Sequence, residues 1–145
     1  MKSLAFWGLM RNLDGNILFA AHDLDHFLAC SHGTLLDIRN LQEPLPKSQD
    51  DEQLQLLRVK GFEHERTWLE GLKQKRMSVV ETLEARSLGE RVDATLKAMA
   101  WGADIIYQAA LLSGKWPGHA DFLRRKGTGV NGPIYEVIDT NSWID

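Results

Sequence analysis

The sequence predicts a mixed α/β (α+β) fold in which a long helix leads into a sheet. Residues 52–75 repeat leucine and aromatic side chains at helical spacing, which is typical of one long amphipathic helix. Three extended runs follow it, at 105–112, 116–123 and 134–139, and they are rich in residues that favour strands. We therefore expect a helix followed by a three-stranded, mostly antiparallel sheet.

Length and composition exclude several classes of protein. A chain of 145 residues with 43% hydrophobic and 26% charged residues is typical of one globular domain, divided here into 1–49 and 50–145. The formal charge of -3 argues against a protein that coats nucleic acid by charge alone. Cys30 is the only cysteine, which excludes an iron–sulfur cluster held by four cysteines of this chain. We expect a buried thiol at Cys30 and a cytoplasmic protein.

The first third of the chain predicts short elements. The apolar run at 1–10 is too short to cross a membrane, and no membrane association is expected. We interpret this run as an arm or strand that leads into a turn at 14–15. Asp23 is the expected N-cap of a short helix, and a second short helix should contain 35–38. The segment 40–51 contains prolines and polar residues and predicts an exposed connection.

The remaining elements follow from local patterns. The long helix carries His64 on its apolar side. Residues 77–83 could form a strand, and a helix over 92–100 should end at Gly102. The pair at 113–114, serine followed by glycine, predicts a hairpin between the first two extended runs.

A glycine-rich segment matches the dinucleotide-binding pattern G-x-G-x-x-G at residues 127–132. That pattern works at the start of a helix, whose N-terminus holds the pyrophosphate. Here Pro133 and an extended run follow instead of a helix. We therefore interpret 126–133 as a flexible connection with a turn at 131–132, and we do not expect a nucleotide cofactor.

Two aspartates near strand ends predict a cation site. Side chains alternate along a strand, so Asp139 and Asn141 share a face. Asp121 can converge with Asp139 if their strands are neighbours. Carboxylate oxygens suit a hard cation such as Mg²⁺ or Mn²⁺. His64 on the packed helix is the candidate for a third ligand.

The same residues carry a family resemblance. Gly61-x-x-His64, then Gly118-x-x-Asp121, then the start of a D-x-K motif at 139–140 resemble the ordered motifs of RecB-like nucleases of the PD-(D/E)xK superfamily. The resemblance implies a restriction-endonuclease-like core.

Further segments narrow the resemblance to the N-terminal domain of one RecB-like nuclease family. These segments are 23–24 with 27–32, 106–108 and 120–123, and the likeness covers about 13–140. Longer relatives of this kind often carry a helicase-like region after the domain.

The resemblance implies a role for each matching residue. His64, Asp121 and Asp139 would bind Mg²⁺ or Mn²⁺, joined by the carbonyl of Thr140. The ion would lower the pKa of a bound water and stabilise charge on the scissile phosphate. Asp121 and Asp139, with Asn141 in the position of the lysine, would form the catalytic group. The implied activity is hydrolysis of DNA, as in DNA repair.

Two basic clusters are the expected contacts to a DNA backbone, on a single strand or a duplex end. An equally weighted alternative is that these charges are only solvated. The clusters consist of Lys73, Lys75 and Arg76, and of Arg124, Arg125 and Lys126.

Two departures from the family pattern leave the function open. Asn141 replaces the expected lysine, and the residues after it do not resemble the family's continuation. We expect a truncated domain that lacks a C-terminal helix and a fourth strand. A sheet face left bare in this way favours a homodimer. The alternative to an impaired nuclease is a non-catalytic remnant that binds nucleic acid or protein.

Overall fold

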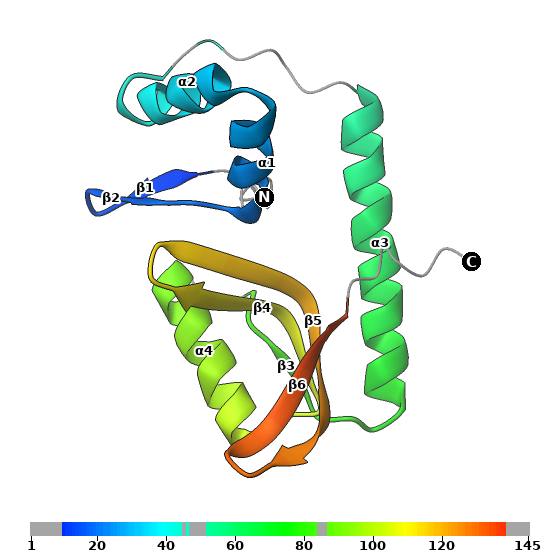
Figure 1. Cartoon of the computed structure of the whole chain (residues 1–145). Coiled ribbons are helices and arrows are strands. Elements are labelled where there is room, and N and C mark those ends of the chain that lie inside the picture. Colours follow the sequence, from blue (N-terminus) through cyan, green and yellow to red (C-terminus); the bar gives the residue numbers. More distant parts are fainter. Residues whose placement is uncertain (1–9, 45, 47–51, 84–86, 139–145) are drawn as a thin grey trace. The chain divides into compact units, whose positions relative to one another are not determined.

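The computed structural model describes residues 10–44, 46, 52–83 and 87–138, with only the backbone for 52–55, 57 and 58. This part of the chain has mixed α and β structure, with four helices and two sheets, as predicted at the level of fold class (Figure 1). The elements are β1 (Arg11–Leu13), β2 (Asn16–Leu18), α1 (Ala21–Ala29), α2 (Ser31–Gln42), α3 (Glu52–Gln74), β3 (Val79–Glu81), α4 (Leu88–Trp101), β4 (Ile105–Ser113), β5 (Trp116–Gly129) and β6 (Gly132–Ile138).

The chain divides into two compact units. The first unit comprises Met1–Ser48 and Leu112–Gly118, so the tip of the β4–β5 hairpin belongs with the N-terminal elements. The second comprises Gln49–Leu111 and His119–Asp145 and contains the larger sheet. No helix among the described residues is long and apolar enough to cross a membrane.

The first unit begins with the turn expected at residues 14–15. Strands β1 and β2 pair in antiparallel fashion around Asp14 and Gly15, and both residues have positive φ angles. The Asn12 Oδ1 atom accepts a hydrogen bond of 2.9 Å from the Gly15 N–H. Asparagine, aspartate and glycine tolerate this left-handed backbone, so the turn was predictable.

Helix α1 corrects the expected role of Asp23. The N-cap is Ala20, and Asp23 lies three residues later, buried in the first turn. Its two carboxylate oxygens accept hydrogen bonds from the N–H groups of Ala20, at 2.6 Å, and Met10, at 3.1 Å. A carboxylate at the third position of a helix accepts the N–H of the N-cap residue, as in a capping box. Asp23 therefore stabilises the start of α1 without being its N-cap.

Cys30 is also placed differently from the expectation of a buried thiol. Its side chain is exposed, and its Sγ atom accepts a hydrogen bond of 3.4 Å from the Gly33 N–H as the N-cap of α2. The cap position lies outside the packed surface of the helix, which explains the exposure. Helix α2 continues through Gln42, so the connection after it starts later than residue 40.

The larger sheet has four strands in the order β3-β4-β5-β6, so the expected count of three was wrong. The additional strand β3 pairs in parallel with β4, with Val79 opposite Ile105. A parallel pair needs a crossover connection, and α4 provides it. The helix ends at Gly102, in the left-handed conformation, as predicted.

Strand β5 continues through the segment that the sequence predicted to be a flexible connection. Residues 127–129 pair with β6, and the turn lies at Val130 and Asn131, one residue earlier than expected. Gly132 has a φ of 115°, which the tight return of the chain requires. The register shifts between Arg125 and Gly127, so the ladder has an irregularity there.

Each face of the four-stranded sheet packs against one helix (Figure 1). The α3 face buries large side chains, led by Phe122, Tyr107 and Leu69. The α4 face buries mostly small ones, including Ala98, Ala109 and Ala120 together with Ile106 and Leu123. The described part of the sheet therefore has a helix on both faces.

Candidate functional site

His64 and Glu65 occupy adjacent positions on α3 but face different surroundings. The His64 side chain is exposed, which corrects the expectation that it lies on the buried side of the helix. It nevertheless borders a groove beside Trp68 and Leu72. Glu65 is half-buried and reaches strand β4. One turn of α3 thus supplies both a histidine at a groove and a carboxylate against the sheet.

Asp121 lies on β5, half-buried and one residue before Phe122. The Phe122 ring packs edge-on against the Trp68 ring of α3, with 4.3 Å between centroids. Trp68 lies one helical turn after His64, so α3 meets β5 close to both predicted ligands. Phe122 is opposite Ile138 in the antiparallel β5–β6 pair, so β5 and β6 are neighbours as the cation-site prediction required.

A partly buried polar cluster joins α3 to β4. One oxygen of Glu65, Oε2, accepts hydrogen bonds from the Tyr107 hydroxyl at 3.1 Å and the Gln108 amide at 2.8 Å. Burial raises the pKa of Tyr107 well above its ordinary value, and the negative charges of Glu65 and Asp121 raise it further. Tyr107 therefore keeps its proton and remains a hydrogen-bond donor. We call Glu65, Tyr107 and Gln108 the Glu65 cluster.

Gln108 has an unusual backbone conformation, with a φ of +55° inside strand β4. Its carbonyl accepts hydrogen bonds from Thr82 Oγ1, at 2.5 Å, and Arg91 Nη2, at 2.6 Å. A left-handed residue that is not glycine costs on the order of 1 kcal/mol or more, which these contacts offset. The left-handed backbone at Gln108 interrupts the regular alternation of side chains between the two faces of β4. Ile106 and Ala109 therefore both pack on the α4 face, and the Gln108 amide is directed to α3.

The groove next to α3 has a volume of about 370 Å³. We call it the α3 groove. Its walls combine apolar and basic side chains from α3, the segment after it, β5 and β6. The lining residues are His64, Trp68, Leu72, Lys75, Met77, Arg124 and Ile138.

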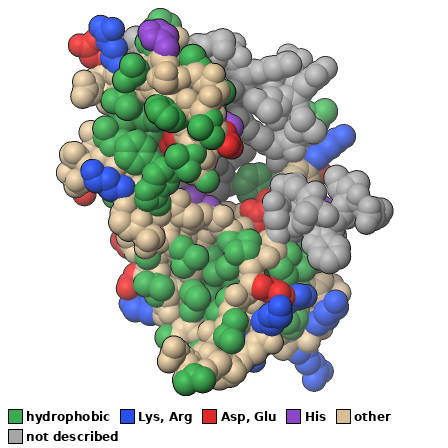
Figure 2. Space-filling model, viewed as in Figure 1, with side chains coloured by type: hydrophobic (Ala, Val, Ile, Leu, Met, Phe, Trp, Pro, Cys, Tyr) green, Lys and Arg blue, Asp and Glu red, His purple; other side chains and the backbone are tan. Residues whose placement is uncertain are grey.

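Most of the predicted DNA-binding cations are engaged in ion pairs. Lys73 contacts Glu81 at 2.8 Å and Glu70 at 3.3 Å, and the hydrogen bond to Glu81 is the main reason that the pKa of Lys73 is raised. On the surface in Figure 2, Lys and Arg side chains lie beside Asp and Glu side chains. These charges are therefore partly neutralised within the protein.

The second basic cluster shows the same pairing. Arg124 and Lys126 both contact Glu136, Lys126 at 3.6 Å, and the Arg124 hydrogen bond lowers the pKa of Glu136. Arg125 contacts Asp104 at 2.7 Å. Within the described part of the chain, Lys75 and Arg76 are the predicted cations with no carboxylate at ion-pair distance.

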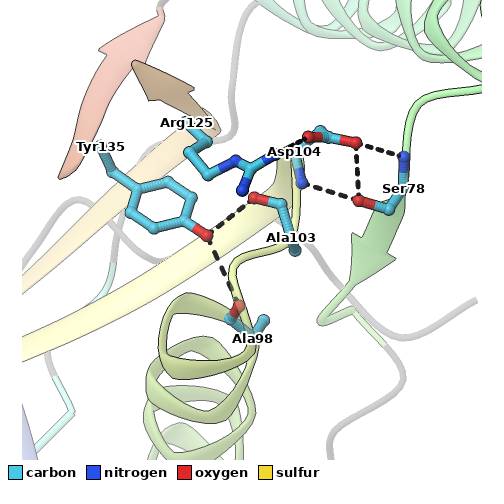
Figure 3. Close-up of polar contacts among 6 residues, drawn as sticks. All are labelled: Ser78, Ala98, Ala103, Asp104, Arg125 and Tyr135. Carbon is cyan, nitrogen blue, oxygen red and sulfur yellow. Dashed lines mark hydrogen bonds and ion pairs between the residues drawn. The ribbon is translucent and has the colours of Figure 1, made fainter. Parts of the chain in front are cut away.

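The Arg125 pair belongs to a network at the residues that precede β3 and β4 (Figure 3). Asp104 accepts hydrogen bonds from the N–H and hydroxyl of Ser78, at 2.9 and 2.8 Å, and its pKa is lowered mainly by these bonds. The Tyr135 hydroxyl donates to the Ala103 carbonyl at 2.7 Å. Arg125 therefore has a structural role between β5 and the start of β4.

The remaining residues of the predicted site, Asp139, Thr140 and Asn141, lie outside the described residues. Within the ranges that are described, no three His, Cys, Asp or Glu side chains are close enough together to hold a metal ion. The predicted ligand set depends on Asp139 for its third member, so this set stays a prediction.

Sequence reasoning assigned no role to Glu65, Tyr107, Gln108 or Trp68. A signal was present for two of them, since a tyrosine and a glutamine interrupt the otherwise apolar run at 105–112. Polar side chains within a buried strand require partners, which points to a polar cluster. The partner residue itself depends on how α3 packs, which the local pattern does not reveal.

Comparison with known proteins gives no relative: no protein-family model, no curated protein and no solved structure matches this chain.

Proposed function

We propose that this chain is a RecB-like DNA nuclease domain that depends on Mg²⁺ or Mn²⁺, impaired in activity by Asn141. The observation that supports it best is the contact between Trp68 and Phe122, which brings α3 and β5 together close to His64 and Asp121. Strand β6 pairs with β5 and ends at Ile138, and Asp139 is the next residue in the sequence. The motif order of the resemblance thus falls on elements that pack together.

The donor set of this proposal suits a hard cation. His64, Asp121 and Asp139 would hold the ion with the Thr140 carbonyl, and the bound ion would supply an activated water and stabilise phosphate charge. The Asn141 amide can donate a hydrogen bond but carries no charge. Loss of one preorganised electrostatic contact costs on the order of 100-fold in rate, so we expect weak activity.

Calorimetric titration with Mn²⁺ tests the ligand set. We expect the wild type to bind Mn²⁺ and Asp121→Ala to bind it at least about 10-fold more weakly. Asp93→Ala is the matched control, because Asp93 is an aspartate on the exposed surface of α4, paired with Lys97. Equal binding by the two variants, or no binding by the wild type, would contradict the metal site.

Restoration of the lysine tests catalysis. We expect Asn141→Lys to increase Mg²⁺-dependent cleavage of single-stranded DNA by about 100-fold. The double variant with Asp121→Ala should lose that gain. If Asn141→Lys shows no cleavage in Mg²⁺, the catalytic part of the proposal fails.

A second candidate function is a non-catalytic module that binds nucleic acid. The observation that favours it is Asn141 itself, which cannot supply the positive charge of a lysine. Salt-dependent DNA binding without cleavage, in both the wild type and Asn141→Lys, would support this candidate. A homodimer, a helicase-like region beside the domain and a cytoplasmic location remain expectations for either candidate. The homodimer was expected from a bare sheet face, but α3 and α4 each cover one face of the described sheet, so this reason for it does not apply there.

A further inference from the structure

We propose that the α3 groove binds unpaired nucleotides of a single DNA strand, with Trp68 as the base contact and Lys75 as the phosphate contact. This inference rests on the proposed function and extends it to the form of the substrate. It starts from the groove volume of about 370 Å³, which falls within the range of about 300–1,000 Å³ typical of ligand sites.

The apolar part of the groove suits a flat ring. Trp68, Leu72, Met77 and Ile138 form its walls. The Trp68 ring is held in place by its edge-on contact with Phe122, which itself has no exposed surface. A fixed aromatic ring binds a base without losing side-chain freedom, and stacking tolerates every base.

The charged part of the groove suits a phosphate. Lys75 and Arg124 both border it. Arg124 shares Glu136 with Lys126, so its charge is partly balanced. Lys75 has no carboxylate at ion-pair distance among the described residues, and its charge is thus available to an anion. An aromatic wall beside such a cation matches a nucleotide better than a purely apolar ligand.

A second hollow adjoins the groove and indicates a polymer. It has a volume of about 220 Å³ and is bordered by Thr67 and Gly71 of α3. Four residues border both spaces, namely His64, Trp68, Leu72 and Lys75. Two hollows that share one tryptophan and one lysine fit two consecutive nucleotides, with the connecting phosphate at Lys75.

The groove favours a single strand over a duplex. Bases in a duplex are paired and stacked on each other, so their faces are not free to contact Trp68 without flipping. Single strands expose base faces and bind to aromatic side chains within a positively charged groove. His64 borders both hollows, so the strand would pass the proposed metal ligand.

The experiment measures fluorescence anisotropy of a labelled strand of about 12 nucleotides in EDTA over a range of salt concentrations. We expect Lys75→Ala to weaken binding and to reduce the slope of log K against log salt by about 0.7, the value for one phosphate contact on a single strand. Trp68→Leu should weaken binding by about 5-fold or more with an unchanged slope, and Trp68→Phe should restore most of it.

Matched controls use residues away from the groove. Lys97→Ala removes the same charge from the exposed surface of α4, and Trp101→Leu removes an exposed tryptophan from the same helix. Neither should change binding. Two competitors test the form of the ligand: a duplex, made by annealing the strand to its complement, and thymidine monophosphate. Each should displace the labelled single strand poorly.

Four results would overturn the inference. These are equal effects of Lys75→Ala and Lys97→Ala, equal binding of duplex and single strand, full competition by the mononucleotide, and unchanged binding by folded Trp68→Leu. If Trp68→Leu does not fold, the salt dependence of strand binding by Lys75→Ala decides whether the inference holds. EDTA removes the metal, so strand binding is measured independently of the metal site. If the protein binds the strand but not Mn²⁺, the nuclease proposal fails and the groove proposal stands. If it binds Mn²⁺ but not the strand, the groove proposal fails and the nuclease proposal stands.

Discussion

The two faces of the four-stranded sheet each pack against a helix, but with side chains of different size. On the α3 face, Phe122 contacts both the Trp68 ring and the Tyr107 ring, the latter at 4.9 Å between centroids. On the α4 face, alanines at 98, 109 and 120 form half of the buried cluster. Large rings leave spaces at their edges, and the α3 groove opens on that side. The small side chains of the α4 face are buried.

This difference separates a face suited to binding from a face suited to stability. The α3 face holds the groove and the Glu65 cluster. The polar contacts of the α4 face serve the backbone instead, since Thr95 accepts from the Ala110 N–H and Tyr135 donates to the Ala103 carbonyl. Substitutions on the two faces should consequently differ in their effects on the free energy of unfolding.

The largest effect should come from Phe122→Ala. Phe122 has no exposed surface and joins Trp68 to Tyr107, so the variant loses both burial and two ring contacts. We expect a loss of about 3–5 kcal/mol in the free energy of unfolding, measured by urea denaturation. Leu123→Ala, the next residue and on the α4 face, is the comparison, expected at about 2–5 kcal/mol. A loss below about 1 kcal/mol for Phe122→Ala would contradict the role of that core.

Enlarged side chains should distinguish the faces most clearly. Ala109→Leu places additional atoms in a filled space and should cost about 1–3 kcal/mol in the free energy of unfolding. Leu72→Phe enlarges a residue that borders the α3 groove, so the ring can extend into open space, and the expected cost is below about 1 kcal/mol. Equal costs in urea denaturation would show that the two faces are packed alike.

Tyr107→Phe should reveal a dependence of stability on alkaline pH. The variant loses a hydrogen bond to a carboxylate, at a cost of about 1.5 kcal/mol near neutral pH. The pKa of Tyr107 is raised on folding, so its contribution is complete below the unfolded value of about 10 and is lost as the pH rises above it. Unfolding measured from pH 8 to 11 should therefore show a smaller difference between wild type and variant at the alkaline end. A constant difference would contradict this prediction.

Tyr135→Phe is the α4-face counterpart and should have a smaller effect than Tyr107→Phe. Its hydroxyl donates to the carbonyl of Ala103, which does not titrate. We expect a loss of about 1 kcal/mol in the free energy of unfolding that stays the same between pH 5 and 8. A loss larger than that of Tyr107→Phe in the same range would reverse the ranking of the two hydroxyl groups.

The sequence was informative where one short pattern determines the structure. The stripe at 52–75 predicted α3, and the serine and glycine at 113–114 predicted the β4–β5 hairpin, because helix periodicity and tight turns are local properties. For β3, the sequence indicates only that residues 77–83 could form a strand. Its parallel partner is 26 residues away, and no local pattern specifies that pairing.

The candidate site was predictable only in part for the same reason. His64 and Asp121 stand out by residue type and motif spacing. Glu65 does not, because its importance depends on a contact with Gln108, 43 residues later in the chain. The left-handed backbone of Gln108 was also unpredictable, since glutamine rarely adopts it and only tertiary contacts stabilise it.

The contact between Ser78 and Asp104 has a consequence for the order of folding. It closes a segment of 26 residues that contains α4, and it lies beside the Val79–Ile105 pair. Hairpins form early because their contacts are local, whereas a parallel pair must wait for its crossover helix. Strands β4, β5 and β6 should therefore associate first, and β3 should join last. In pulsed hydrogen exchange during refolding, we expect the Ile105 N–H, which bonds to the Ser78 carbonyl, to gain protection after the Phe122–Ile138 ladder.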